Sequence, residues 1–133
     1  MCIRDRLEQD ALNTFLPLCE KRGIKIVTGG PYNSGILATG AIEGAFYNYD
    51  PAPEKIMAKV KSIEAVCEAH NVSLKAAALQ FPLLHPTHLS VIPGAQTQNE
   101  LNDNIKVYSE TIPSSLWSDL KSENLLSSDA PID

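Results

Sequence analysis

The stretch I-K-I-V-T-G-G-P, residues 24–31, decides the fold. Its first five residues are mostly apolar and β-branched, and two glycines and a proline follow them. This composition is typical of a short buried strand that ends in a turn. An amphipathic helix is predicted just before this strand, over residues 7–22. Its apolar side chains recur at spacings of three and four, its last turn is cationic, and Gly23 follows it.

A second short strand is expected at L-S-V-I, residues 89–92, where a proline and a glycine follow. A long connection rich in Gly, Pro, Asn and Tyr, residues 29–53, separates the first strand from two predicted helices. These helices span residues 53–70, on an apolar stripe at spacings of four and three, and residues 74–84, where Ser73 is placed to cap the start.

The sequence after the second strand predicts two further helices. T-Q-N-E, residues 97–100, is a capping-box pattern whose helix runs to about Val107, and a short helix follows Pro113. Strands that alternate with helices predict an α/β fold with parallel strands and helical crossovers. A (β/α)8 barrel needs about 250 residues, or about 31 per strand–helix unit, so 133 residues supply little more than two units. We therefore expect a piece of such a barrel.

The composition describes a folded protein without features for binding nucleic acid or membranes. Hydrophobic residues make up 44% and charged residues 20%, and 11 basic against 16 acidic side chains give a net charge of -5. Phosphate backbones need a surplus of Lys and Arg, and a membrane span needs about 18 consecutive apolar residues. The sequence meets neither requirement, so we expect no nucleic-acid partner and no membrane partner. The three cysteines form no C-x-x-C pair, so we expect a reducing, cytoplasmic setting.

Longer stretches carry a family resemblance. They are L-E-Q-D-A-L-N-T-F-L-P-L-C-E-K-R-G-I (7–24), G-G-P-Y-N-S-G-I-L-A-T-G (29–40), A-A-L-Q-F-P-L-L-H-P (77–86), S-V-I-P-G-A (90–95) and I-P-S-S-L-W-S-D-L-K-S-E-N-L-L (112–126). Together they resemble the aldo-keto reductases, most of all the group of D-threo-aldose 1-dehydrogenases (L-fucose dehydrogenases) and pyridoxal 4-dehydrogenases.

The resemblance implies that this chain is the C-terminal third of a (β/α)8 TIM barrel, with its two strands as the seventh and eighth. It covers residues 7–126. Residues 1–6 do not resemble the family, so we expect them to be an artefactual leader, and we expect residues 127–133 to be a frayed tail.

The family transfers a hydride between a nicotinamide cofactor and a carbonyl or alcohol carbon, here of an aldehyde or sugar substrate. An Asp-Tyr-Lys-His tetrad in the first half of the barrel performs the proton chemistry. The resemblance therefore implies no catalytic residue in this chain and an inactive fragment, and we expect no metal site. The alternative is a non-catalytic fragment that binds a nucleotide or another protein.

The expected cofactor contacts lie in the loops after the two strands, where barrel enzymes commonly bind phosphate. In the first loop, glycines let backbone amides approach the pyrophosphate and polar side chains can donate to it. The residues expected there are Gly30, Pro31, Tyr32, Asn33, Ser34, Gly35 and Leu37. The preceding residue is Gly29, where many members carry an aromatic ring that stacks on the nicotinamide.

The second loop and its helix supply the remaining contacts, namely Pro93, Gly94, Ala95, Gln96, Thr97, Glu100, Asp103 and Asn104. Many members hold a 2′-phosphate with a Lys-Ser pair and an Arg, which fall here on Gly94, Ala95 and Glu100. Because no basic group stands at these positions and Glu100 adds a negative charge, NAD is favoured over NADP. Glu100 also has a plainer interpretation as the third residue of the capping box, and the two roles are compatible.

Overall fold

The computed structural model describes residues 9–132, so the predicted leader lies outside the described residues. The α-helices are α1 (Phe15–Lys21), α2 (Ile36–Thr39), α3 (Glu54–Ala69), α4 (Leu74–Gln80), α5 (Gln98–Tyr108) and α6 (Ser114–Ser122). The strands are β1 (Ile26–Gly29), β2 (Phe46–Tyr47), β3 (Asp50–Pro51) and β4 (His88–Ile92), and two 3-10 turns are η1 (Asp10–Leu12) and η2 (Phe81–Leu84).

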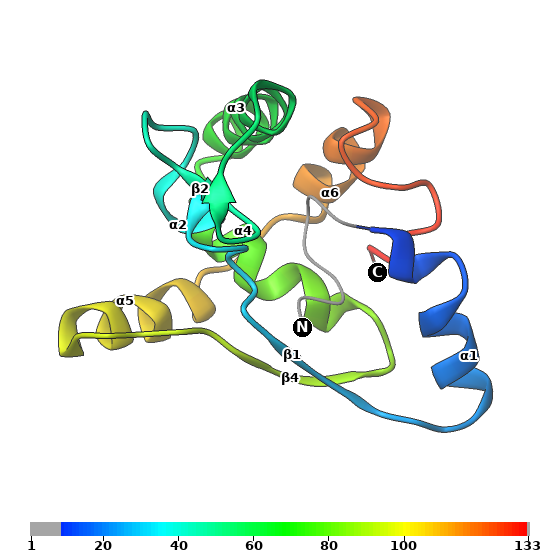
Figure 1. Cartoon of the computed structure of the whole chain (residues 1–133). Coiled ribbons are helices and arrows are strands. Elements are labelled where there is room, and N and C mark those ends of the chain that lie inside the picture. The colour runs from blue at the N-terminus through cyan, green and yellow to red at the C-terminus, as the bar shows by residue number, and fades with distance from the viewer. Residues whose placement is uncertain (1–8, 133) are drawn as a thin grey trace.

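The centre of the fold is a parallel pair of strands, β1 and β4. Thr28 pairs with Val91 and Gly29 with Ile92, and the crossover between the strands contains α2, α3 and α4. In Figure 1 the helices lie on one side of this pair, which runs along the lower edge of the view. The prediction of an α/β chain with parallel strands and helical crossovers is confirmed.

The two faces of the strand pair differ in exposure. Ile26 and Thr28 are buried on the helix side, whereas Val27 is 52% exposed and Ile92 is 62% exposed. Parallel sheets are normally covered on both faces, because their crossover helices pack against them. Within residues 9–132 only the helix side of this sheet is covered.

The first predicted helix is interrupted, which corrects the expectation of one continuous helix over residues 7–22. In the described part, η1 is followed by a break, and α1 begins at Phe15. Pro17 explains the break because a proline inside a helix loses one backbone hydrogen bond and clashes with the preceding turn. Starting the helix at Phe15 puts Pro17 in the first turn, where its missing N–H costs nothing.

The long connection after β1 is more ordered than the sequence suggested. It contains α2 and a hairpin in which β2 pairs antiparallel with β3. The two turn residues, Asn48 and Tyr49, have positive φ values of 49° and 69°. This is the conformation that a two-residue hairpin turn requires, and Asn adopts it more readily than most residues.

Local chemistry sets both ends of α4, and a side-chain contact joins the end of α3 to α6. The Ser73 side chain accepts from Ala76 N at 3.1 Å, which confirms the predicted cap. Beyond Gln80, Pro82 has no N–H for another helical bond, so the predicted helix over residues 74–84 ends in the 3-10 turn η2. At the end of α3, His70 joins α6 through Asp119, with Nε2 and Oδ2 2.8 Å apart.

The C-terminal segment, for which we expected fraying, makes specific contacts in its described part. Ser127 N donates to Gln9 Oε1 across 2.6 Å, and Gln9 Nε2 donates to the Leu125 carbonyl. Ala130 is buried. These contacts lay the last residues against the segment that precedes α1.

Candidate functional site

The loops that follow β1 and β4 begin at the same edge of the sheet, because parallel strands place their carboxyl ends together. Gly30 N donates to the Ile92 carbonyl at 3.2 Å, so the pairing continues to the point where both loops begin. We call residues 30–35 the first loop and residues 93–97 the second loop. In open α/β sheets, ligands bind outside the carboxyl ends of the strands. These two loops are therefore the candidate site.

The first loop has a constrained backbone. Asn33 and Ser34 have φ values of 44° and 56°, and Gly35 has a φ of 101°. Two hydrogen bonds hold this conformation: Asn48 N donates to Asn33 Oδ1 at 3.0 Å, and Tyr49 N donates to Ser34 Oγ at 2.8 Å. The turn of the β2–β3 hairpin is therefore fixed to the first loop.

The predicted contacts in the first loop differ in accessibility. Gly30 and Ser34 are exposed, Gly35 is partly buried, and Pro31, Tyr32, Asn33 and Leu37 are buried. Leu37 belongs to the hydrophobic core, and the Asn33 side chain is directed to the hairpin. Their role as cofactor contacts stays a prediction; what the structure places at the surface is the backbone around Ser34.

A chain of two hydrogen bonds, one buried and one partly buried, joins the two loops. Tyr32 Oη donates to Asn104 Oδ1 at 2.8 Å, and Asn104 Nδ2 donates to the Gly94 carbonyl at 3.3 Å. Burial, with a smaller contribution from the negative charge of Asp103, raises the pKa of Tyr32 well above its usual value. Tyr32 therefore keeps its proton and remains a donor. We call this chain the Tyr32–Asn104–Gly94 tie.

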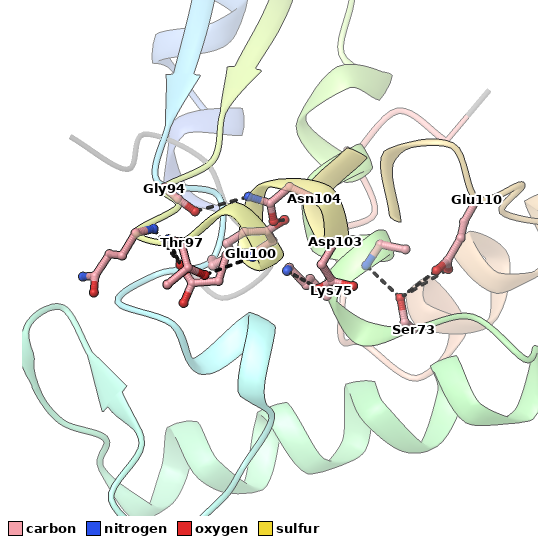
Figure 2. Close-up of polar contacts among 11 residues, drawn as sticks. Ser73, Lys75, Gly94, Thr97, Glu100, Asp103, Asn104 and Glu110 are labelled. Carbon is pink, nitrogen blue, oxygen red and sulfur yellow. Dashed lines mark hydrogen bonds and ion pairs between the residues drawn. The ribbon is translucent and has the colours of Figure 1, made fainter. Parts of the chain in front are cut away.

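Lys75 supports the same region from α4. Its Nζ donates to Asp103 Oδ2 and lies 5.4 Å from the centroid of the Tyr32 ring, within the range of a cation–π contact. The hydrogen bond from Lys75, and then its positive charge, hold the pKa of Asp103 below its usual value. Figure 2 shows this pair beside Asn104 on α5. Lys75 was not predicted from the sequence, since no local motif links residues 28 positions apart.

The other end of α4 also holds α5. Gln80 Nε2 donates to the carbonyls of Val107, Tyr108 and Glu110, at 3.0, 3.2 and 2.9 Å. These carbonyls lie at or just beyond the C-terminus of α5, where helix carbonyls have no partner within the helix. Helix α4 thus fixes α5 at two points and, through α5, the second loop.

The N-terminus of α5 confirms the capping box. Glu100 N donates to Thr97 Oγ1 at 3.2 Å, while Glu100 Oε2 accepts from Thr97 N at 3.3 Å and from Gln96 N at 2.6 Å. Figure 2 shows these bonds grouped at the start of the helix. The Glu100 carboxylate therefore occupies the place where a helix N-terminus would otherwise attract another anion.

The second loop is otherwise accessible. Gly94, Ala95, Gln96 and Thr97 are exposed, Pro93 is partly buried, and a side chain added at Gly94 would meet no atom within 4 Å. Of the predicted contacts on α5, Glu100 and Asp103 are exposed, whereas Asn104 is buried in the tie. The exposed backbone of the second loop and that of the first loop both follow the same edge of the sheet.

Residues 9–132 contain neither a cluster of metal-ligating side chains nor a helix of membrane-spanning type. No group of three or more His, Cys, Asp or Glu side chains in this range is arranged to hold a metal ion. None of the helices described is long and apolar enough to cross a membrane.

Comparison with known proteins identifies the family. The profile of the aldo/keto reductase family matches residues 3–124, a range that takes in part of the six residues expected to lie outside the resemblance. The chain belongs to the aldo/keto reductase family. It is 36% identical over 121 residues to a pyridoxal 4-dehydrogenase from Microbacterium luteolum and 34% identical over 121 residues to a D-threo-aldose 1-dehydrogenase from a Pseudomonas species.

This aldo/keto reductase chain matches only part of each relative. The alignments cover 91% and 90% of the chain but 35% and 37% of the two dehydrogenases. The chain thus spans about a third of the length of the curated relatives it matches. Its fold is similar to that of a thermostable aldo-keto reductase crystallised with the inhibitor epalrestat, with a TM-score of 0.60, 18% sequence identity, and coverage of 90% of this chain and 37% of the other.

Proposed function

We propose that this chain supplies the dinucleotide-binding part of an aldose- or pyridoxal-type dehydrogenase. In this proposal β1 and β4 are the seventh and eighth strands of a (β/α)8 barrel, so the chain is its C-terminal third. Barrel enzymes commonly bind phosphate with the loops after these two strands. The small aldehyde or sugar substrate and the cytoplasmic location expected from the sequence belong to the same proposal.

The observation that carries the proposal is the tie between the two loops. A dinucleotide is long, so it must contact both loops at a fixed separation. Tyr32 and Asn104 join the loops through a buried and a partly buried hydrogen bond, and the exposed backbone at Ser34 and Gly94 lies at the open edge. Ordering the two loops before the ligand arrives reduces the entropy that binding would otherwise cost.

The arrangement of α5 supports NAD over NADP. A 2′-phosphate at the start of α5 would meet the Glu100 carboxylate, which already accepts from two backbone N–H groups. Residues 93–104 contain no Lys or Arg, and the nearby Lys75 is paired with Asp103. A 2′-hydroxyl carries no charge, so it would meet no such repulsion.

The bound nicotinamide would supply the hydride chemistry, and this chain would bind and orient the dinucleotide. Ser34 and the second loop would contact it, while Tyr32, Asn104 and Lys75 would hold those loops in place. Because the proton-transferring tetrad of the family is expected in the part of the barrel not included here, the chain by itself is proposed to be inactive.

Isothermal titration calorimetry of the 133-residue chain with NAD and with NADP tests the proposal. We expect NAD to bind and NADP to bind more weakly. A carboxylate about 5 Å from a phosphate in a largely aqueous site repels it by about 1 kcal/mol per charge. Glu100→Gln should therefore improve NADP affinity about three- to tenfold while leaving NAD affinity nearly unchanged.

Thr97→Ala is the matched control, since it weakens the helix cap but keeps the carboxylate charge. It should leave the preference for NAD intact. Equal effects of Glu100→Gln and Thr97→Ala on the NAD/NADP ratio would mean that Glu100 acts only through the cap. Failure of the wild-type chain to bind either dinucleotide would contradict the proposal for this chain.

A further inference from the structure

A serine, a histidine and an aspartate form a hydrogen-bonded chain where the end of α3 meets α6, outside the two loops of the candidate site. His70 is the C-terminal cap of α3, whereas Ser115 and Asp119 belong to α6. Asp119 Oδ2 lies 2.8 Å from His70 Nε2, and Ser115 Oγ lies 3.3 Å from His70 Nδ1. The imidazole therefore lies between a carboxylate and a hydroxyl.

The packing of α6 fixes this arrangement. Helices α3 and α6 pack against each other, as Figure 1 shows. Three apolar side chains of α6 are almost completely buried, namely Leu116, Trp117 and Leu120. Residues four positions apart lie on the same face of a helix, so Ser115 and Asp119 both reach the one imidazole at the end of α3.

Asp119 sets the tautomer of the imidazole. An ionised carboxylate can only accept hydrogen bonds, so His70 Nε2 carries the proton and donates it to Asp119 Oδ2. In a neutral imidazole Nδ1 is then an acceptor, and Ser115 Oγ donates to it. The hydroxyl proton of Ser115 is thus directed at a nitrogen that can accept it.

Two other serines of α6 make a different kind of contact. Ser118 Oγ donates to the Ser114 carbonyl at 3.4 Å, and Ser122 Oγ donates to the Asp119 carbonyl at 2.9 Å. These are bonds of a helical serine to the preceding turn of its own helix. Ser115 is instead exposed to solvent and paired with the imidazole. A hydroxyl next to a base that a third group orients is the arrangement that activates a serine nucleophile.

We propose that Ser115, His70 and Asp119 form a hydrolytic site for small carboxylic esters. Ser115 Oγ attacks the ester carbonyl carbon while its proton passes to His70 Nδ1. The bond from this carbon to the alcohol oxygen then breaks, and the alcohol leaves with the proton from His70. Water attacks the resulting acyl-serine and gives a proton to His70, which returns it to Ser115 Oγ as the acid is released.

The start of α6 supplies donors for the negative oxygen of the intermediates. Ser114 and Ser115 are the first two residues of α6, and N–H groups in a first turn have no carbonyl partner within the helix. The positive end of the helix dipole adds to their effect. The N–H of the nucleophile's own residue is a donor that serine hydrolases use in this way. Dinucleotide binding plays no part in this reaction.

Hydrolysis of 4-nitrophenyl acetate by the 133-residue chain, without any dinucleotide, tests the proposal. Absorbance follows the release of nitrophenol, and mass spectrometry of proteolytic peptides locates the acetyl group. We expect an acetyl group on Ser115. Because a positioned general base typically contributes about 10²–10⁴-fold to a rate, Ser115→Ala and His70→Gln should each slow hydrolysis about tenfold or more.

Ser118→Ala is the matched control, because Ser118 is an exposed serine of the same helix that bonds a carbonyl instead of the imidazole. It should change the rate less than about twofold, and circular dichroism should show that every variant keeps the fold. Equal rates for the wild-type chain and Ser115→Ala would overturn the proposal, since an imidazole alone would then account for hydrolysis. Acetylation of lysines without acetylation of Ser115 would overturn it too, as would an equal loss of rate in Ser118→Ala.

Discussion

Removing the hydroxyl of Tyr32 tests the tie between the two loops directly. Tyr32→Phe keeps the ring and its packing but deletes the donor that reaches Asn104 Oδ1 at 2.8 Å. Because Asn104 is buried, water does not readily replace that donor. The substitution therefore removes the hydrogen-bond donor of the buried Asn104 Oδ1.

The expected loss of unfolding free energy is about 1–3 kcal/mol. A typical hydrogen bond contributes about 0.5–1.5 kcal/mol net, and a buried group left without its partner costs about 1–3 kcal/mol. For urea slopes of about 1–3 kcal/mol per M, the loss should lower the midpoint by about 1 M. Amides of the second loop around Gly94 should also exchange faster, since Asn104 is then oriented from one side only.

Urea unfolding followed by far-UV circular dichroism measures the loss, with Tyr49→Phe as the matched control. The Tyr49 side chain is 89% exposed, so its hydroxyl can bond to water in both folded and unfolded chains. The control should change stability by less than about 0.5 kcal/mol. If Tyr32→Phe has an effect as small as Tyr49→Phe and leaves amide exchange near Gly94 unaltered, the reasoning about the tie is wrong.

Four further predictions concern the scaffold of the site. Thr97→Ala should lower the unfolding free energy by about 1 kcal/mol, because it removes the cap of α5, and Thr97→Asn should retain most of it; urea unfolding of both variants checks this. Gly40→Ala should cost about 1–3 kcal/mol and more than Gly23→Ala. Both glycines have positive φ, but an added Cβ at Gly40 also displaces the Glu64 carboxylate of α3, which accepts from Ala41 N, whereas at Gly23 it meets nothing within 4 Å; thermal unfolding should rank them in that order. Because the pKa of Asp103 is lowered in the folded chain, the ionised carboxylate stabilises the fold above pH 3.8, its ordinary pKa, and this stabilisation is lost as pH falls below that value. Asp103→Asn should therefore flatten the acid side of a plot of unfolding free energy against pH. The raised pKa of Tyr32 acts at alkaline pH. The protonated hydroxyl stabilises the fold below pH 10.0, the ordinary pKa of tyrosine, and this stabilisation is lost as pH rises above that value, so Tyr32→Phe should flatten the alkaline side of the same plot.

Local patterns were sufficient for most of the secondary structure. The capping box from Thr97 to Glu100 and the Ser73 cap are both formed, because each joins atoms only three residues apart. The two strands were found from their β-branched runs, and the order of elements was enough to predict that they are parallel. The apolar spacing alone favours one continuous helix, so it does not predict the break before α1 that Pro17 marks.

The candidate site was predicted in outline, not in detail. The two loops could be selected because both follow strand ends, and parallel strands bring those ends together. Which side chains remain free in the loops depends on what each one meets after packing. Asn33, which was predicted to offer a polar side chain to the pyrophosphate, is buried and accepts a hydrogen bond from the hairpin turn.

The sequence by itself determined the class of fold, the family and the two loops of the candidate site, because these depend on local composition and order along the chain. The tertiary structure alone decided how the loops are held. Tyr32 and Asn104 are 72 residues apart, and Lys75 and Asp103 are 28 apart. No helix or turn repeat links positions at such distances, so these pairs exist only because the parallel strands and the packing of α4 against α5 bring them together.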